Sequence, residues 1–271
     1  MTPGSSIYYH VGVDLALACW LGCCLGSFLN VVIYRLPKEE SLSFPRSRCP
    51  RCRKTIAFYD NIPVLSWLLL AGRCRNCRKA ISPRYPLIEA AMGALSVALW
   101  IRWRDLPLWA VLAVLAAGVL LAVAMIDWDT FLIPDELSLG LLALGLAAAP
   151  FNPLMGGASW LWSVGFSAKG ALIGFFMCWA TAAAGEKLFG KEAMGGGDVK
   201  LLAAVGAWTG GLGAFDCLLL GSLLGSVYGV FLIARGTLKR SDPIPFGPFL
   251  SAAAVFNLFW LLPLGFPFIT R

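Results

Sequence analysis

The sequence predicts an all-α, polytopic membrane protein with about eight transmembrane helices and a small cytoplasmic loop domain that binds zinc. Three observations carry this prediction. The 271 residues are 59% hydrophobic, whereas soluble domains are usually about half apolar. The mean hydropathy is +0.75, and the apolar residues gather in long runs. Between the first two runs lies a polar, basic loop with two Cys-x-x-Cys pairs.

The apolar runs define the expected membrane spans, since a helix needs about 20 residues to cross the hydrocarbon core. The first run lacks a basic flank and contains Asp14, so we expect a retained helix and no cleaved signal peptide. The fourth and eighth runs are short or interrupted by Pro and Gly. The expected spans are 11–34, 86–103, 107–126, 137–151, 166–184, 199–215, 217–234 and 247–263.

These spans predict three segments along the chain. Residues 1–34 form the first transmembrane helix. Residues 35–85 form a cytoplasmic, four-cysteine zinc-binding subdomain, and residues 86–271 form the transmembrane core.

The net charge of +7 follows a membrane topology and does not indicate a nucleic-acid partner. The loop from Arg35 to Arg84 holds 12 of the 22 basic residues. Because Lys and Arg accumulate on the cytoplasmic side of membrane proteins, we expect this loop inside and the N-terminus outside. Asp127 then ends an inward-running span and Asp198 begins an outward-running one. Both carboxylates are therefore expected at the cytoplasmic face.

The loop cysteines are spaced as two knuckles, Cys49-Pro-Arg-Cys52 and Cys74-Arg-Asn-Cys77. Two such pairs can supply four thiolates to a tetrahedral zinc ion. Basic neighbours favour the thiolate form, and a cytoplasmic location disfavours persistent disulfides. We expect a structural zinc site that stabilises a segment too short to build a large core. A redox dithiol and unligated cysteines are the alternatives.

Two acidic sites follow or precede apolar helices. Asp127 ends one, and Gly195-Gly196-Gly197-Asp198 opens another. Taken singly, Asp127 is explained as an interfacial charge and Asp198 as a helix N-cap. A carboxylate at the bilayer edge is costly, however, and by default indicates function. Glycine lets another backbone approach closely, so Gly195 and Gly197 are expected to admit an extended substrate beside Asp198.

Two carboxylates at one depth are the minimum apparatus of an aspartyl protease, in which they share a proton and activate a water molecule. Other catalytic sets fit poorly: the single histidine, His10, is predicted outside, and no His-Glu-x-x-His motif is present. An ion-coupled transporter that uses both aspartates is an alternative, although it would favour inverted repeats and carboxylates near the midplane. A non-enzymatic assembly factor that docks a cytoplasmic ATPase is another, but it leaves the paired aspartates unexplained.

The motifs together resemble those of the prepilin peptidase family, also called type IV leader peptidases, over nearly the whole chain. A Gly-x-Gly-Asp element alone also resembles presenilin-type proteases, so the combination carries the resemblance. Besides the two cysteine pairs, the matching stretches are Gly26–Pro37, Asp60–Trp67, Ile81–Glu89, Asp127–Asp135 and Gly195–Leu202.

The resemblance implies an enzyme of the bacterial inner membrane. Such enzymes remove the short basic leader from prepilins or pseudopilins of type IV pilus and type II secretion systems, cutting after a glycine at the cytoplasmic face. By motif position, Asp127 and Asp198 match the family's catalytic aspartates. The family's zinc-binding pairs match Cys49, Cys52, Cys74 and Cys77.

Members with the long cysteine loop are bifunctional and also methylate the new N-terminal amine, with S-adenosylmethionine as the donor. The resemblance thus implies this cofactor too, although the sequence has no Gly-x-Gly-x-x-Gly signature of its own. The polar candidates for a methyl-donor pocket are Asn30, Arg35, Asp60 and Glu89.

Overall fold

The computed structural model describes residues 3–155, 159–190, 194–239 and 242–260, and helices dominate these ranges, as predicted. The chain forms two compact units, residues 1–114 and 115–271, with the boundary inside α4. Four short 3-10 helices accompany the α-helices, at Leu36–Lys38, Phe58–Asn61, Ala149–Phe151 and Pro153–Met155. The α-helices are α1 (Pro3–Arg35), α2 (Leu65–Leu69), α3 (Arg84–Trp103), α4 (Pro107–Thr130), α5 (Asp135–Ala148), α6 (Trp160–Phe189), α7 (Gly196–Ala234) and α8 (Gly247–Phe259).

Four helices of the described ranges are long and apolar enough to cross a bilayer. They cover Gly12–Lys38, Pro107–Thr130, Trp160–Leu188 and Gly196–Ala234. Helices α3, α5 and α8 have 20, 14 and 13 residues and fall outside this set. The count of eight spans is therefore not confirmed, and residues 261–263 of the expected eighth span lie outside the described residues.

The predicted boundary between spans 199–215 and 217–234 is wrong. Both ranges lie in the 39-residue helix α7, and its kink is at Gly210, where φ is 73° and ψ is −179°. Glycine adopts such positive φ values without a steric penalty. A turn made by one residue does not interrupt the apolar run, so hydropathy could not locate it.

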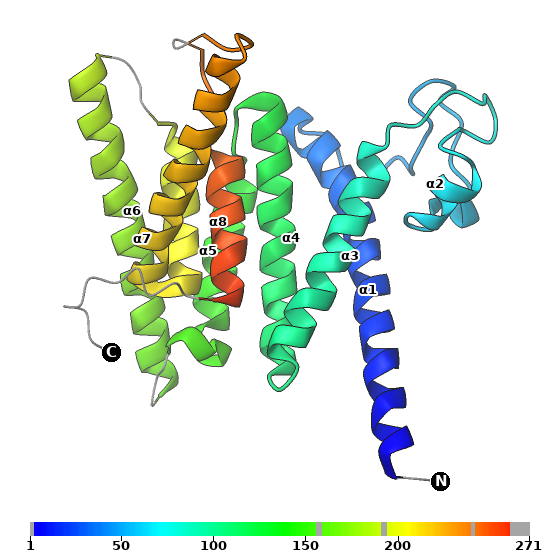
Figure 1. The fold of residues 1–271 in the computed structure, drawn as a ribbon, viewed down its shortest axis with the longest axis horizontal. Helices are drawn as coiled ribbons and strands as arrows, with labels where there is room; N and C mark the ends of the chain where they lie inside the picture. Colours follow the sequence, from blue (N-terminus) through cyan, green and yellow to red (C-terminus); the bar gives the residue numbers. More distant parts are fainter. Residues whose placement is uncertain (1–2, 156–158, 191–193, 240–241, 261–271) are drawn as a thin grey trace. The chain divides into compact units, whose positions relative to one another are not determined.

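In the first unit, α1 packs closely against α3 (Figure 1). A Cβ atom added at Gly26 of α1 would lie 2.7 Å from the Cα atom of Glu89 on α3. Further along the same contact, the Asn30 side-chain amide donates a hydrogen bond to the Tyr85 carbonyl oxygen at 3.2 Å. Small residues thus let the two backbones meet, as is common between membrane helices.

In the second unit, α6 and α7 make a similarly close glycine contact (Figure 1). A Cβ atom on Gly170 of α6 would overlap the Gly206 carbonyl oxygen of α7 and lie 2.8 Å from the Gly210 Cα atom. One turn along, Gly174 faces the backbone of Leu202. These contacts hold the first half of α7, which carries Asp198 in its first turn, against α6.

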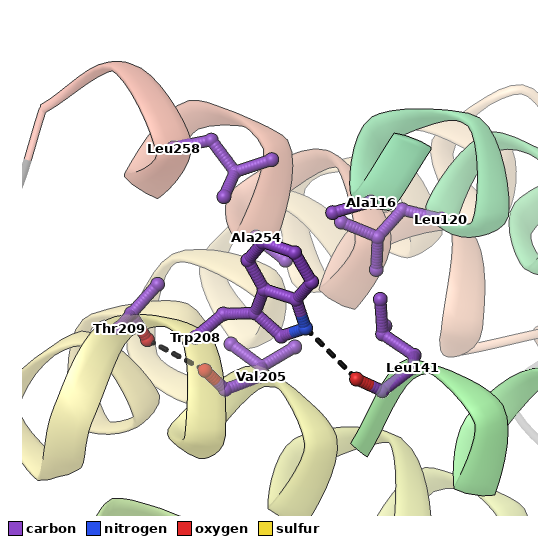
Figure 2. Close-up of a pocket in the computed structure, with 8 residues that line it drawn as sticks. All are labelled: Ala116, Leu120, Leu141, Val205, Trp208, Thr209, Ala254 and Leu258. Carbon is purple, nitrogen blue, oxygen red and sulfur yellow. Dashed lines mark hydrogen bonds between the residues drawn. The ribbon is translucent and has the colours of Figure 1, made fainter. Parts of the chain in front are cut away.

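Trp208 joins α7 to α5 beside a small apolar pocket (Figure 2). Its indole N–H donates to the Leu141 carbonyl oxygen at 2.9 Å, and its own carbonyl accepts from the Asn152 side chain at 2.7 Å. The pocket has no titratable lining residue, so we interpret it as part of the packed core. It is lined by Ala116, Leu120, Leu141, Val205, Trp208, Thr209, Ala254 and Leu258.

Replacing Gly170 with Ala should destabilise the protein, because the new methyl group would meet the backbone of α7. Gly165→Ala is the matched control on the same helix, since its added Cβ would meet nothing within 4 Å. In a helix interior Ala is favoured over Gly by about 0.5–1 kcal/mol. Thermal unfolding in detergent should therefore show a lower midpoint for Gly170→Ala and an equal or higher one for Gly165→Ala. Equal midpoints for both variants would contradict the close contact.

Candidate active site and metal site

Asp127 lies in the last turn of α4 and is buried, with 5% of its surface exposed. Its Oδ2 atom accepts a hydrogen bond from the backbone N–H of Gly247, at 2.8 Å. Gly247 is the first residue of α8. The positive end of a helix dipole therefore faces this carboxylate and offsets part of the cost of its burial.

Asp198 lies in the first turn of α7 and is also buried, with 8% exposed. The N-cap of this helix is Gly195, so the N-cap interpretation of Asp198 is wrong. The Asp198 backbone N–H donates to the Gly195 carbonyl oxygen at 3.1 Å. Its Oδ1 atom has no hydrogen-bond partner among the residues that the structure describes. A buried acceptor without a partner is costly, so this oxygen is prepared for a ligand that donates.

The structure brings Asp127 and Asp198 together although 70 residues separate them in the sequence. They belong to the same compact unit, and their carboxylates interact electrostatically. Two buried carboxylates that repel each other favour the state in which they share a single proton. This is the chemistry that acid–base activation of a water molecule requires.

Gly247 is the site residue that sequence reasoning missed. A Cβ atom at this position would lie 2.7 Å from Oδ2 of Asp127, so only glycine leaves room for the hydrogen bond. The available signal was the run Pro243-Ile-Pro245-Phe-Gly247-Pro248, in which glycine and proline define a sharp entry into a helix. Nothing in that run indicates a partner 120 residues away.

The expectation that Gly195 and Gly197 both leave room for a substrate does not hold at Gly197. A Cβ atom on Gly197 would lie 2.9 Å from the Cβ atom of Ile133, in the segment after α4. Gly197 therefore lets α7 begin against this segment, and that space is already filled. Gly195 and Gly196 are exposed, and a Cβ atom on Gly196 would meet nothing within 4 Å. Open space beside the backbone is thus found at Gly196 and not at Gly197, and a Cβ atom on Gly195 would lie 3.5 Å from Oδ2 of Asp198.

An ion pair fixes the start of α7 relative to the start of α5. The Lys200 ammonium group lies 2.7 and 2.8 Å from the two carboxylate oxygens of Asp135. Lys200 follows Asp198 by two residues, so its side chain leaves α7 on a different face. The pair holds the helix end that carries Asp198 without placing Asp135 in the buried site.

The four predicted cysteines converge in the first unit, and their sulfur atoms all lie within 4.8 Å of one another. The Sγ atoms of Cys49 and Cys77 are 3.9 Å apart. Tetrahedral bonding at about 2.3 Å to a metal gives sulfur separations of about 3.8 Å. The cluster is therefore able to bind a metal ion.

The two knuckles repeat the same backbone geometry. The Cys49 backbone N–H donates to the Lys54 carbonyl, and the Cys49 carbonyl accepts from the Arg53 N–H. Cys74 makes the same two hydrogen bonds with Lys79 and Arg78. The residues four positions after each first cysteine, Arg53 and Arg78, both have φ of 57°. Two equivalent turns thus present their thiols to one point.

The thiols of the cluster differ in acidity. Burial opposes ionisation of Cys49, but hydrogen bonds from the Cys52 and Arg51 backbones outweigh it and lower the pKa of Cys49 to about 7. At Cys77 the Lys79 backbone favours the thiolate, yet burial and hydrogen bonds with the other thiols prevail and raise the pKa to about 11. Ionising Cys77 near neutral pH therefore needs the charge of a bound cation.

The four polar residues considered for a methyl-donor pocket each bind elsewhere in the first unit. Asn30 binds the Tyr85 carbonyl, and the Arg35 guanidinium donates to the carbonyls of Ser41 and Pro45 at 2.8 and 2.6 Å. Asp60 accepts hydrogen bonds from the Arg75 side chain, and Glu89 accepts one from the Val64 backbone N–H. All four are thus used to shape the loop.

Asp60 binds Arg75 through both carboxylate oxygens, with contacts between 2.6 and 3.1 Å. These hydrogen bonds lower the pKa of Asp60. Glu89 accepts the backbone N–H of Val64 at 2.7 Å. These charged groups bind protein partners in the structure, and a donor pocket at the four residues stays a prediction.

Fold and site together define a helical membrane protein with two buried carboxylates and a cluster of four thiols that is able to bind a metal ion. Comparison with protein families gives two matches. Residues 20–103 match the model of the bacterial peptidase A24 N-terminal domain, and residues 114–230 match that of the type IV leader peptidase family. Curated relatives that are 37% and 43% identical over most of the chain agree with these matches. The chain therefore belongs to the type IV leader peptidase family.

Curated relatives are similar over most of their length. A protein of Aeromonas salmonicida is 43% identical over 262 residues, with 87% of each chain covered. One of Stutzerimonas stutzeri is 37% identical and covers 96% of this chain and 95% of its own. One of Pseudomonas aeruginosa is 38% identical, with 89% and 88% covered. Each is named prepilin leader peptidase/N-methyltransferase, and the transporter alternative is therefore not supported. No solved structure matched the chain.

The cysteine geometry predicts that the purified protein carries about one metal ion per chain, bound by four thiolates. Chelation and Cys74→Ser should both remove the ion and lower the thermal midpoint, because metal binding contributes folding energy. Cys19→Ser, at an exposed cysteine of α1, is the control and should keep the metal. Elemental analysis with thermal unfolding tests this. Metal-free protein as stable as the metal-bound form would argue against a stabilising site.

Proposed function

We propose that this protein is a membrane endopeptidase that removes the short basic leader from type IV prepilins or pseudopilins. Cleavage follows a glycine at the cytoplasmic face. One observation carries the proposal: Asp127 and Asp198 are buried together at the ends of two apolar helices. Membership of the leader peptidase family and the names of the relatives support it.

In this proposal Asp127 and Asp198 are the catalytic pair and share one proton. The ionised carboxylate takes a proton from a water molecule between them, and the protonated one polarises the scissile carbonyl and later protonates the leaving amine. Because the two groups titrate as a coupled pair, the proton belongs to the pair. The partnerless Oδ1 atom of Asp198 offers an acceptor for that water.

Gly247 serves as a positioning residue for this pair. Its N–H fixes Oδ2 of Asp127 and so sets the orientation of the carboxylate. Aligned acid–base groups lower the barrier only while the reacting atoms stay close to the productive geometry. The start of α8 is therefore part of the active site although it supplies no titratable group.

The substrate's chemistry suits a site at the membrane boundary. A prepilin has a cationic leader followed by an apolar helix, so the helix can remain in lipid while the leader stays in water. Asp129 and Glu136, both exposed, follow Asp127 along the chain and favour a cationic segment electrostatically. The exposed backbone at Gly195, which lies next to the Asp198 carboxylate, and the open space at Gly196 give an extended peptide access beside Asp198.

We also propose the inner membrane as the location, with eight crossings and the N-terminus outside. The positive-inside bias of the 35–85 loop supports this orientation. The kink at Gly210 divides α7 into two segments and permits two short crossings. The division into residues 1–34, 35–85 and 86–271 stays a prediction.

Zinc is the proposed ion of the cysteine site, with a structural role, because four thiolates leave no open coordination position for a substrate. The relatives' names also support N-methylation of the new N-terminal residue, with S-adenosylmethionine as the methyl donor. Asn30, Arg35, Asp60 and Glu89 stay the polar candidates for the donor pocket, and we assign no methyl-transfer step to them.

Asp127→Asn and Asp198→Asn should each abolish cleavage of a purified prepilin in detergent. Loss of a general acid or base costs about 10²- to 10⁴-fold in rate. Asp105→Asn, at an exposed carboxylate between α3 and α4, is the control and should cleave normally. Thermal unfolding must show that each variant is folded. Full activity in either Asn variant would remove that residue from the mechanism.

Gly247→Ala should reduce the cleavage rate constant more than it changes the Michaelis constant. The added methyl group would displace Oδ2 of Asp127, and misplacement of a catalytic group by about 1 Å can cost about 10²-fold. Gly140→Ala, where a Cβ atom meets nothing within 4 Å, is the matched control. Steady-state kinetics on the two variants measures the effect, and an unaltered rate in Gly247→Ala would argue that the hydrogen bond is dispensable.

A further inference from the structure

Helix α2 presents its leucines outward. Leu65, Leu68 and Leu69 are 52%, 59% and 85% exposed, whereas Ser66 is buried at 7%. Residues spaced i, i+3 and i+4 lie on one face of a helix. In water a short helix buries such a face and exposes its serine. The arrangement in α2 is the reverse, so these leucines require an apolar environment outside the protein.

Hydrogen bonds hold α2 beside the start of α3. The Val64 N–H, just before α2, donates to the Glu89 carboxylate at 2.7 Å, and the Trp67 indole donates to the Ile81 carbonyl at 3.2 Å. Glu89 in turn packs against Gly26 of α1, within the apolar span Gly12–Lys38. The start of α2 is therefore tied to the part of the first unit that lies in or at the bilayer.

The turn before α2 has a strained backbone, which shows that contacts with the rest of the protein hold α2 in place. Val64 has φ of 60° and ψ of −52°, and the Leu65 N–H donates back to the Pro63 carbonyl at 2.6 Å. This is the rare γ-turn with positive φ, which a β-branched residue adopts only when its surroundings hold it. The hydrogen bond from the Val64 N–H to the Glu89 carboxylate holds Val64 in this conformation.

The segment of the chain that contains α2 is strongly basic. The chain from Arg35 to Arg84 has twelve basic and three acidic residues. Anionic phospholipid headgroups attract such clusters at the cytoplasmic surface. The exposed basic residues of this subdomain include Arg46, Arg48, Arg51, Arg53, Lys54, Arg73, Arg75, Arg78 and Lys79.

We propose that α2 is an interfacial anchor that fixes the cysteine subdomain to an anionic membrane surface. Leu65, Leu68 and Leu69 insert at the boundary between headgroups and acyl chains, and the surrounding basic side chains bind the headgroups. The apolar helix of a substrate would also suit the leucines. The positive charge of the subdomain repels a cationic leader, however, and this favours lipid as the occupant.

The test is photo-crosslinking from the full chain in nanodiscs. A diazirine analogue of leucine is placed at position 69, and for comparison at position 54, an exposed lysine of the first knuckle. Discs are made from phosphatidylethanolamine with phosphatidylglycerol, or from phosphatidylcholine alone. Mass spectrometry then identifies adducts with lipid, with and without an added prepilin.

The anchor predicts a lipid adduct at position 69 in the anionic discs that is severalfold stronger than at position 54. It also predicts a clear loss of this adduct in phosphatidylcholine. Absence of lipid adduct at position 69, or an adduct that is indifferent to lipid charge, would overturn the proposal. An adduct with prepilin in place of lipid would assign the face to the substrate. Because these readouts need no cleavage, they are independent of the proposed peptidase activity.

Discussion

The cost of withdrawing two carboxylates from water is the constraint around which the second unit is organised. An isolated buried charge is unfavourable by several kcal/mol or more, and a second one nearby adds repulsion. The N-terminal ends of two helices lie at the carboxylates and offset part of this cost. Asp198 lies in the first turn of α7, and Asp127 faces the first N–H of α8. Helix dipoles offset part of this cost, and the shared proton of the proposed mechanism would remove the repulsion between two full charges.

Helix ends reach these positions only because the neighbouring backbones come unusually close. Gly170 and Gly206 allow α6 and α7 to meet at backbone contact, and Gly197 allows α7 to begin against Ile133. Membrane helices gain little hydrophobic energy from one another, so dispersion contacts of this kind carry much of their association. Glycines far from the acids are therefore as necessary to the geometry of the site as the acids themselves.

Much of this arrangement could be predicted from the sequence, since charge bias and apolar runs are properties of local segments. They correctly predicted that Asp127 and Asp198 lie at helix ends, and the Cys-x-x-Cys spacing indicated the thiol cluster. Contacts between distant segments escaped prediction for the same reason. Asp127 is bound by the backbone N–H of Gly247, and a backbone group of this kind leaves no recognisable pattern of side chains in the sequence. The kink at Gly210 changes direction without changing polarity.

The ion pair of Lys200 also bears on how the acidic pair operates. An ammonium group free to approach Asp198 would stabilise both carboxylates in the ionised form, and no shared proton would remain to polarise a carbonyl. The Lys200 ammonium is instead bound by both oxygens of Asp135, at 2.7 and 2.8 Å. Its charge is thus compensated outside the buried site, although it lies only two residues beyond Asp198. Burial and the nearby charge of Asp127 then remain the main influences on the Asp198 carboxylate. The proposed mechanism needs such a setting, in which no ammonium group favours the ionised state of both carboxylates.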